Sequence, residues 1–421
     1  MLYCIEIIPV IPFEDGRADG KVLGKAGIRH NTDALLNGKH LWDTLGTMDR
    51  ADLGRYVMAR LETPPDYARY PELEDIYPER IDYLRGLAKG ADCSLKEAAI
   101  YSYAVFREEI DLYYHMYQLE RSPGHCSGFI MVGPDGVNGG QNIDSAPVPK
   151  PEGYRHLPVK PYAGLCQSET QSPPSILRKP RTGYIEQWGI GNEKGVAYLG
   201  GGSCGVWLDE PIEDTWPIGR VPLLRFAANV EQLAMLLRRY TLHNWGRDSA
   251  LYADTVGGAI VVEKSYRRIG IRVKRPQDPA IWATEGHWET PEMSAYLKAK
   301  RYEYLEKTGK HLGAGDMQYA ADNAVRFTHL GELCHESWGN DCEHVRRILT
   351  DHAPFPRNIC RHCGPDTDPY DVTVTMKSYI QDITHNRSYT RDWIPWKRFC
   401  CQAPEVVVQY PTRSGECSRP R

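Results

Sequence analysis

The sequence predicts an α+β protein in which helices at both ends of the chain enclose a central region of paired strands. Three observations support this prediction. Short apolar runs separated by glycine-containing turns begin at Cys126, and helical patterns precede and follow them. No repeat, charge run or low-complexity linker divides the chain. The pattern therefore favours one layered unit over two independently folding domains.

The first part of the chain, from residue 1 to about 120, is predicted to be mainly helical after a short strand. Alternation over residues 3–8 predicts that strand. Ser94-Leu95-Lys96-Glu97 has the pattern of a capping box, and the apolar periodicity that follows it predicts a helix that continues toward Tyr117. Ser122-Pro123-Gly124 ends the helical region.

The central and final parts alternate between strand pairs and helices. A surface excursion is expected over residues 145–182, an amphipathic helix over residues 223–243, and a helix that starts at Thr290 with Pro291 in its first turn. The predicted strands are residues 127–132, 140–144, 184–191, 195–200, 250–255, 259–263, 372–375 and 379–382.

Composition excludes several classes of function. The 421 residues include 51 Lys+Arg and 55 Asp+Glu, a net charge of −4 that lacks the basic excess of a nucleic-acid binder. The apolar segment at residues 2–13 is interrupted by Glu6, Pro9 and Pro12, so it is expected to be neither a signal peptide nor a membrane span. Twelve cysteines are too few for a disulfide scaffold, which predicts a reduced, cytoplasmic protein.

A glycine-flanked thiol marks the point where the helical region gives way to strands. Cys126 lies in Pro123-Gly124-His125-Cys126-Ser127-Gly128-Phe129, and Asn142 and Asp144 follow beyond one predicted hairpin. A cysteine considered alone is more often a small core residue than a nucleophile. An aspartate or asparagine near a turn is likewise often structural.

Several segments, in a common order, resemble the acyl-coenzyme A:6-aminopenicillanic acid acyltransferase family of N-terminal nucleophile (Ntn) hydrolases. That family is distantly related to penicillin V acylase and bile-salt hydrolase. The matching segments, spread over much of the chain, are residues 126–129, 140–144, 192–197, 252–258, 349–352 and 358–362.

The resemblance implies a four-layer αββα sandwich with antiparallel sheets and a chain that cuts itself. The cut would fall between His125 and Cys126, which separates a mainly helical segment 1–125 from a catalytic segment 126–421. The freed α-amine of Cys126, with an ordinary pKa of about 8, would then serve as base for its own thiol. The thiolate would form an acyl-enzyme and pass the acyl group to water or to an amine.

The same resemblance assigns roles to further residues. Asp144 corresponds to the aspartate that holds the new amine and thiol in register, and Asn142 is a weaker candidate. An arginine on a late helix is also expected, for which Arg301 is the nearest candidate. The implied substrate is a small acyl amide or acyl thioester, with coenzyme A only as part of a substrate and no bound cofactor. The two cleaved fragments are expected to stay associated.

Two features depart from the family pattern. His125 stands where members have glycine before the cysteine, which alters the geometry available for self-cleavage. The segment Ala283–Trp288 lacks the family's oxyanion asparagine; the backbone of Gly286 or the ring of His287 would have to replace it, because the Glu285 carboxylate cannot donate a hydrogen bond. The alternative is therefore a catalytically impaired relative that acts as a binding protein.

A zinc-stabilised binding protein is the other form of that alternative. Cys360-Arg361-His362-Cys363, His352 and the pair Cys400-Cys401 contain potential ligands. A structural zinc site requires two ligand pairs at regular spacing, and this sequence has only one C-x-x-C. The prediction is therefore that no metal is bound.

Overall fold

The computed structural model describes residues 4–5, 12–36, 50–62, 73–102, 126–145, 190–191, 195–203, 227–239, 248–265, 268–285, 287–309, 316–336, 339–354, 358–361, 374–385, 387–392 and 405–409. The helices are α1 (Pro12–Leu36), α3 (Arg50–Glu62), α4 (Leu73–Ala91), α7 (Val230–Arg239), α8 (Pro291–Thr308), α9 (Asp316–His335) and α10 (Cys342–Leu349). The strands are β1 (Cys4–Ile5), β2 (Ser127–Gly133), β3 (Gly136–Ser145), β4 (Ile190–Gly191), β5 (Val196–Ser203), β6 (Asp248–Asp254), β7 (Ala259–Lys264), β8 (Ile269–Val273), β9 (Ala280–Thr284), β10 (Val374–Asp382), β11 (Arg387–Asp392) and β12 (Glu405–Gln409).

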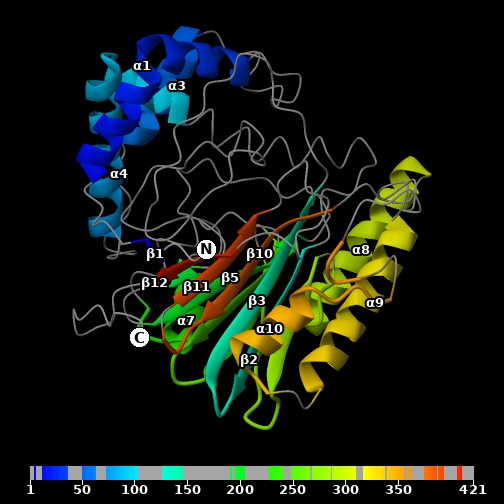
Figure 1. The fold of residues 1–421 in the computed structure, drawn as a ribbon. Helices are drawn as coiled ribbons and strands as arrows, with labels where there is room; N and C mark the ends of the chain where they lie inside the picture. Colours follow the sequence, from blue (N-terminus) through cyan, green and yellow to red (C-terminus); the bar gives the residue numbers. More distant parts are fainter. Residues whose placement is uncertain are drawn as a thin grey trace.

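Two sheets form the centre of the molecule (Figure 1). One has seven strands in the order β1-β12-β11-β10-β3-β2-β9, and the other has five in the order β4-β5-β6-β7-β8. The β1–β12 pair is parallel, and the other described pairs are antiparallel. Short hairpins connect β2 to β3 and β6 to β7, as the glycine-containing turns predict.

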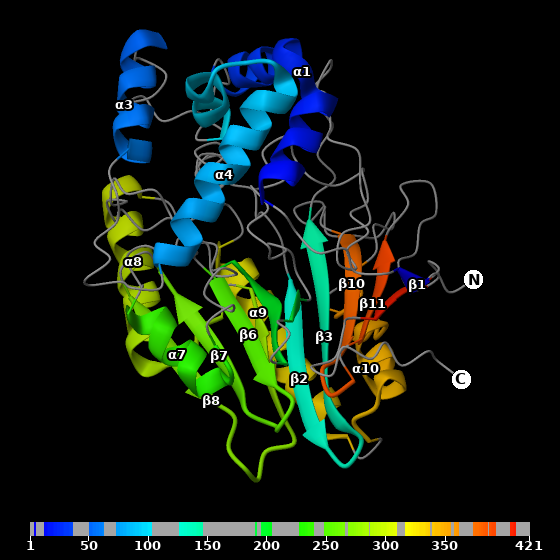
Figure 2. The same ribbon diagram turned by 90° about the vertical axis from the view of Figure 1, so that its left-hand side faces the viewer.

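Helices cover the outer face of each sheet, so the core has four layers (Figure 2). One apolar cluster lies between α7 and the five-stranded sheet and includes Leu233 and Tyr252. A second lies between the sheets and includes Ile130 and Leu251. A third lies between the seven-stranded sheet, α9 and α10. The αββα sandwich with antiparallel sheets that the resemblance implies is confirmed.

Alternation along β2 assigns its residues to two different layers. Phe129 packs in the cluster beneath α9 and α10, whereas Ile130 packs between the sheets. At Gly128 a Cβ atom would lie 2.6 Å from the Gly200 carbonyl oxygen of the opposite sheet. Only glycine permits this close approach, which brings the two sheets together two residues from Cys126.

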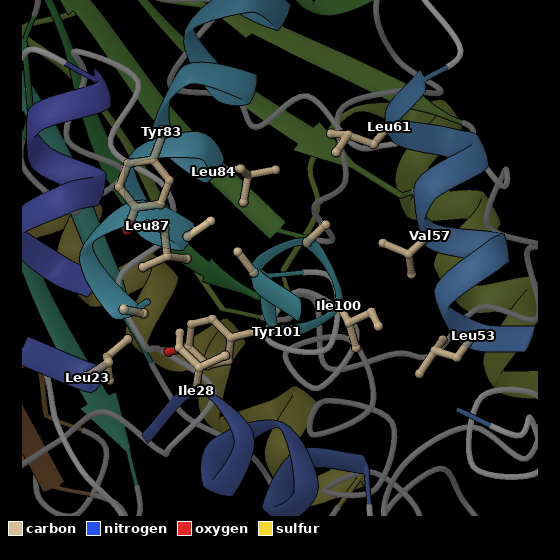
Figure 3. Packing of buried hydrophobic residues seen from close by; sticks show 14 residues of the cluster. Leu23, Ile28, Leu53, Val57, Leu61, Tyr83, Leu84, Leu87, Ile100 and Tyr101 are labelled. Carbon is tan, nitrogen blue, oxygen red and sulfur yellow. The ribbon is translucent and has the colours of Figure 1, made fainter. Parts of the chain in front are cut away.

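The helices near the start of the chain have an apolar cluster of their own (Figure 3). Its labelled members include Leu23, Val57, Leu84 and Tyr101, and every described residue of this cluster precedes residue 102. These helices lie at one end of the sandwich, the end toward which the β3 arrowhead points in Figure 2. The described residues up to 102 are helical apart from β1 and the short connection before residue 95.

Helices α1 and α4 touch through glycines. A Cβ atom at any of four positions would overlap backbone atoms of the partner helix. These positions are Gly16, Gly20, Gly86 and Gly90. Each helix therefore carries two glycines four residues apart on one face. The backbones of α1 and α4 come into direct contact through these faces.

The predicted capping box is present. The Ser94 backbone nitrogen donates to the Glu97 carboxylate (2.9 Å), and the Glu97 backbone nitrogen donates to Ser94 Oγ (3.2 Å). Residues 95–102 are helical, and Arg29 also donates to Glu97. These hydrogen bonds, that of Ser94 first, lower the pKa of Glu97 to about 2.

Replacing Glu97 with alanine is expected to lower the free energy of unfolding by about 1 kcal/mol, because the hydrogen bonds that Ser94 and Arg29 donate to its carboxylate are lost. Since the folded-state pKa is depressed, the contribution of Glu97 is present above its ordinary pKa and disappears as the pH falls toward 2. Urea unfolding at pH 7 and at pH 2.5 measures both effects. An equal difference between the variant and the unchanged chain at the two pH values would contradict this assignment.

Several elements differ from the prediction. The two strands expected at residues 372–375 and 379–382 are one strand, β10, with an irregularity between Thr375 and Lys377. An extra residue at such a point shifts the alternation, so the sequence pattern resembles two strands. Thr290 makes no side-chain cap on α8; instead its backbone nitrogen donates to the buried Glu263 carboxylate (2.8 Å). Residues 146–182 lie outside the described residues.

Candidate active site

Cys126 lies immediately before β2. Strand β2 begins at the end of the sandwich nearest the early helices (Figure 2). Its side chain is buried, with 8% of the residue exposed. The thiol Sγ donates to the backbone carbonyl of Asp144 (3.7 Å), which belongs to the neighbouring strand β3. The hairpin between β2 and β3 thus brings the two predicted residues together: Ser127 pairs with Asn142, two residues before Asp144.

The backbone of Cys126 is held from its other side by Glu285. The Glu285 backbone nitrogen donates to the Cys126 carbonyl (2.9 Å), and the Cys126 nitrogen donates to Glu285 Oε2 (3.2 Å). Glu285 directly follows β9, which pairs with β2. The nitrogen, the carbonyl and the thiol of Cys126 are therefore all fixed by hydrogen bonds to adjacent strands.

Asp144 is buried and makes a strong ion pair. Its Oδ2 accepts from Arg326 Nη2 at 2.8 Å, with both side chains fully buried, and its Oδ1 accepts from Thr375 Oγ1 at 2.6 Å. Burial raises the pKa of Asp144, while the charges of Arg326 and Arg361 oppose that rise. The paired arginine offsets the cost of an isolated carboxylate in this position.

Arg326 comes from α9 and connects that helix to the sheet. Its Nη2 lies 3.5 Å from Ser127 Oγ, and its Nε donates to the Asn358 carbonyl (3.2 Å). The arginine predicted from the sequence is Arg301, which lies in α8; its side chain is outside the described part of the structure, so its role stays a prediction. One signal could have indicated Arg326: it precedes the buried Leu330 and Cys334 at four-residue intervals, so it continues their apolar stripe.

Asn142 holds backbone segments near the site. Its Nδ2 donates to the carbonyls of Leu349 (2.9 Å) and Ile359 (3.0 Å), and its Oδ1 accepts from Ser378 Oγ (2.6 Å). Both amide hydrogens and the amide oxygen are thus engaged. These contacts tie β3 to the end of α10 and to residues 358–361, the region of the late sequence motif.

The predicted oxyanion candidates, Gly286 and His287, follow Glu285 in the sequence. Gly286 and His125 are outside the described residues. The ring of His287 stacks on Phe327 of α9, with 4.2 Å between ring centroids, and its Nε2 is hydrogen-bonded to Glu289. No contact between His287 and Cys126 is described. Its suggested role as an oxyanion donor stays a prediction.

The surroundings of the Cys126 thiol disfavour its thiolate form. Burial contributes most, and the nearby carboxylates of Glu285 and Asp144 add to it, raising the pKa of Cys126 well above its ordinary value. The positive charge of Arg326 acts in the opposite direction with less effect. A base close to the sulfur is therefore needed before Cys126 can act as a nucleophile at neutral pH.

Another matched segment has a structural role. Asp254, in the Tyr252–Gly258 segment, accepts from the backbone nitrogens of Val256, Gly258 and Val230. It thereby shapes the β6–β7 hairpin and binds the start of α7. At Gly258 a Cβ would lie 2.6 Å from the Asp254 carboxylate, which accounts for the glycine at this position of the motif.

Of the potential zinc ligands, only His352 and Cys360 are among the described residues. Cys360 is buried, His352 is exposed, and Cys363, Cys400 and Cys401 lie outside the described residues. In the described part of the chain, no three His, Cys, Asp or Glu side chains are grouped so that they could hold a metal ion. The described helices also include none with an apolar stretch of the length needed to cross a membrane.

No known protein family matches the sequence, and no curated protein is similar to it. The solved structures that are similar to this chain include two hydrolase variants and an acylase. A mutant of the conjugated bile acid hydrolase from Clostridium perfringens has 13% identity and a TM-score of 0.36, and the match covers 68% of this chain and 97% of that one. A second variant of the same hydrolase has 12% identity and a TM-score of 0.33, with 71% and 95% covered. Penicillin V acylase from Agrobacterium tumefaciens has 13% identity and a TM-score of 0.37, with 68% and 86% covered. Identities and TM-scores this low do not establish a shared activity, so function is inferred from the geometry around Cys126.

Proposed function

We propose that the chain is a self-processing cysteine amidase of the Ntn type, with Cys126 as nucleophile. The proposal depends on one observation: a thiol at the head of a central strand, its nitrogen, carbonyl and sulfur each held by hydrogen bonds, beside the buried Asp144–Arg326 ion pair. A purely structural cysteine has no need of a buried ion pair on the neighbouring strand.

The first reaction is cleavage of the chain before Cys126. The thiol attacks the carbonyl carbon of His125, a carbon–sulfur bond forms, and the bond from that carbon to the Cys126 nitrogen breaks. The nitrogen keeps the electron pair and takes the thiol proton. Water then attacks the thioester, which releases residues 1–125 with a carboxyl end and regenerates the thiol of residues 126–421.

Turnover uses the same groups on an external substrate. The free α-amine takes the thiol proton, because its ordinary pKa of about 8 is close to neutral pH. The thiolate attacks the amide carbonyl of a small acylated amine or amino acid, and the amine leaves with a proton from the α-ammonium. Water resolves the acyl-enzyme; an amine in its place would make the reaction an acyl transfer. If the substrate is an acyl thioester, the thiolate attacks its carbonyl carbon in the same way and a thiol leaves in place of the amine.

Intact mass under denaturing conditions is the test of this function. The unchanged chain is expected to give two species that correspond to residues 1–125 and 126–421, whereas Cys126→Ala should give one full-length species. Cys334→Ala is the matched control, since Cys334 is also buried but lies on α9 within an apolar cluster of the core. It should be cut like the unchanged chain.

The second measurement is release of amine from a panel of acyl amides. Activity is expected only in chains that have been cut. A folded, unchanged chain that remains one full-length species would overturn the proposal and favour a catalytically impaired binding protein.

A further inference from the structure

Glu285 occupies the place of a backbone carbonyl in the ladder between β2 and β9. Ser127 pairs with Thr284, so Cys126 and Glu285 are the next opposed residues. In an antiparallel ladder every second opposed pair is a hydrogen-bonded pair, whose two residues exchange both of their N–H···O bonds. Here one is made, from the Glu285 nitrogen to the Cys126 carbonyl, but the Cys126 nitrogen donates to the Glu285 carboxylate. The Glu285 carboxyl group therefore lies 3.2 Å from the nitrogen at which the proposed cut occurs.

The carboxylate of Asp144 makes no described contact with the Cys126 nitrogen and has other partners. Its two carboxylate oxygens bind Arg326 and Thr375, and Arg326 opposes its charge at 2.8 Å. The contact between Asp144 and Cys126 is made by the Asp144 backbone carbonyl and the thiol. The carboxylate in hydrogen-bond contact with the nitrogen is that of Glu285, which is 2% exposed.

We propose that Glu285 is a catalytic residue that stabilises positive charge on the Cys126 nitrogen, first during self-cleavage and then in the free α-ammonium. This role rests on the self-cleavage proposed above. As the bond from the His125 carbonyl breaks, the nitrogen changes from a neutral amide to an amine that takes up a proton. A preorganised carboxylate stabilises that developing charge without having to reorient.

The same contact sets the pH dependence of turnover. Three charged groups act at Cys126: Glu285 and Asp144 favour the ammonium form, whereas Arg326, beside Asp144, disfavours it. Arg361 acts on Asp144, whose pKa it lowers. Because Glu285 is the group in contact with the nitrogen, it raises the pKa of the amine above the ordinary value of about 8. The amine acts as base only when it is deprotonated, so the rate should rise with pH through that raised pKa.

Charge and size make opposite predictions for two variants of Glu285. Glu285→Gln keeps the length and the hydrogen-bond acceptor but removes the charge, whereas Glu285→Asp keeps the charge and shortens the side chain. If Glu285 acts through its charge, the aspartate variant is cut faster than the glutamine variant. A role in packing alone would give the reverse order. Glu292→Gln, at an exposed carboxylate in the first turn of α8, is the matched control.

The experiment follows self-cleavage of the full chain made by cell-free translation, by mass, over time and at several pH values. We expect Glu285→Gln to be cut about 10²-fold more slowly than the unchanged chain, with Glu285→Asp in between and Glu292→Gln unaffected. Amide hydrolysis by the cut glutamine variant should show its rising limb about one pH unit lower.

Three results would overturn the proposal: equal rates for Glu285→Gln and the unchanged chain, a faster Glu285→Gln, or Glu285→Gln cut faster than Glu285→Asp. Near-ultraviolet circular dichroism verifies that each variant is folded. If the glutamine variant is misfolded, the aspartate variant decides alone: an uncut but folded Glu285→Asp contradicts a role based on charge. An uncut unchanged chain would instead refute the proposed function itself, so the two failures are distinguishable.

Discussion

Replacing Arg326 with methionine is expected to lower the free energy of unfolding by roughly 3–5 kcal/mol, the usual cost of removing one partner from a buried ion pair. Asp144 would keep its bond to Thr375 but lose the cation 2.8 Å away in a fully buried position. The pKa of Asp144, already raised by burial, would rise further. Because a raised folded-state pKa costs stability as the carboxylate ionises, the deficit should be larger at pH 7 than at pH 4.

Urea unfolding at both pH values measures this effect. Arg347→Met is the matched control, because Arg347 is an exposed arginine on α10, and its replacement should change stability by less than about 0.5 kcal/mol. Adding Asp144→Asn to Arg326→Met removes the unpaired charge and should recover part of the loss. A deficit below about 1 kcal/mol for Arg326→Met would show that the ion pair does not stabilise the sandwich.

The second large effect is expected at Gly90, where alanine should destabilise the early helices by about 3 kcal/mol. A Cβ there would overlap the backbone of Arg17, so α1 and α4 would have to move apart. Helix propensity alone predicts the opposite sign, since alanine is favoured over glycine by about 1 kcal/mol within a helix. The direction of the change therefore separates the two effects.

Gly54→Ala in α3 is the matched control for Gly90→Ala. The atoms that a Cβ at Gly54 would meet belong to the flexible end of the Lys96 side chain, which can move away. We expect this variant to be neutral or slightly more stable. Thermal unfolding followed by far-ultraviolet circular dichroism compares the two, and equal behaviour of both alanine variants would contradict close backbone packing between α1 and α4.

Local pattern was sufficient to predict much of the fold. The capping box at Ser94, the β2–β3 hairpin and the β6–β7 turn depend on residues close in sequence, and all three are present. The irregularity in β10 was missed because one extra residue changes the phase of alternation without changing composition. The four-layer arrangement was predicted from the family resemblance and not from periodicity.

The site could be predicted only where its residues share a hairpin. Cys126 and Asp144 are close in the chain, and the register of β2 and β3 brings them together. Arg326 and Thr375 reach Asp144 from a distant helix and strand, and their contacts depend on how α9 and β10 pack. The segment that contains Glu285 was singled out only because it lacks the asparagine of the resembled family. The hydrogen bond between Glu285 and the Cys126 nitrogen follows from the pairing of β2 with β9, which no local pattern specifies.

The edge of the seven-stranded sheet bears on the fate of the first fragment. Cys4 and Ile5 of β1 pair with Val407 and Val408 of β12, so the beginning of the chain completes a sheet built otherwise from residues after the proposed cut. Breaking one peptide bond would leave this pairing intact. Removal of the fragment would instead expose the hydrogen-bonding groups of β12 to other chains, a hazard for aggregation. If the chain is cut, we therefore expect residues 1–125 to stay bound as a non-covalent subunit whose strand β1 covers this edge of the sheet.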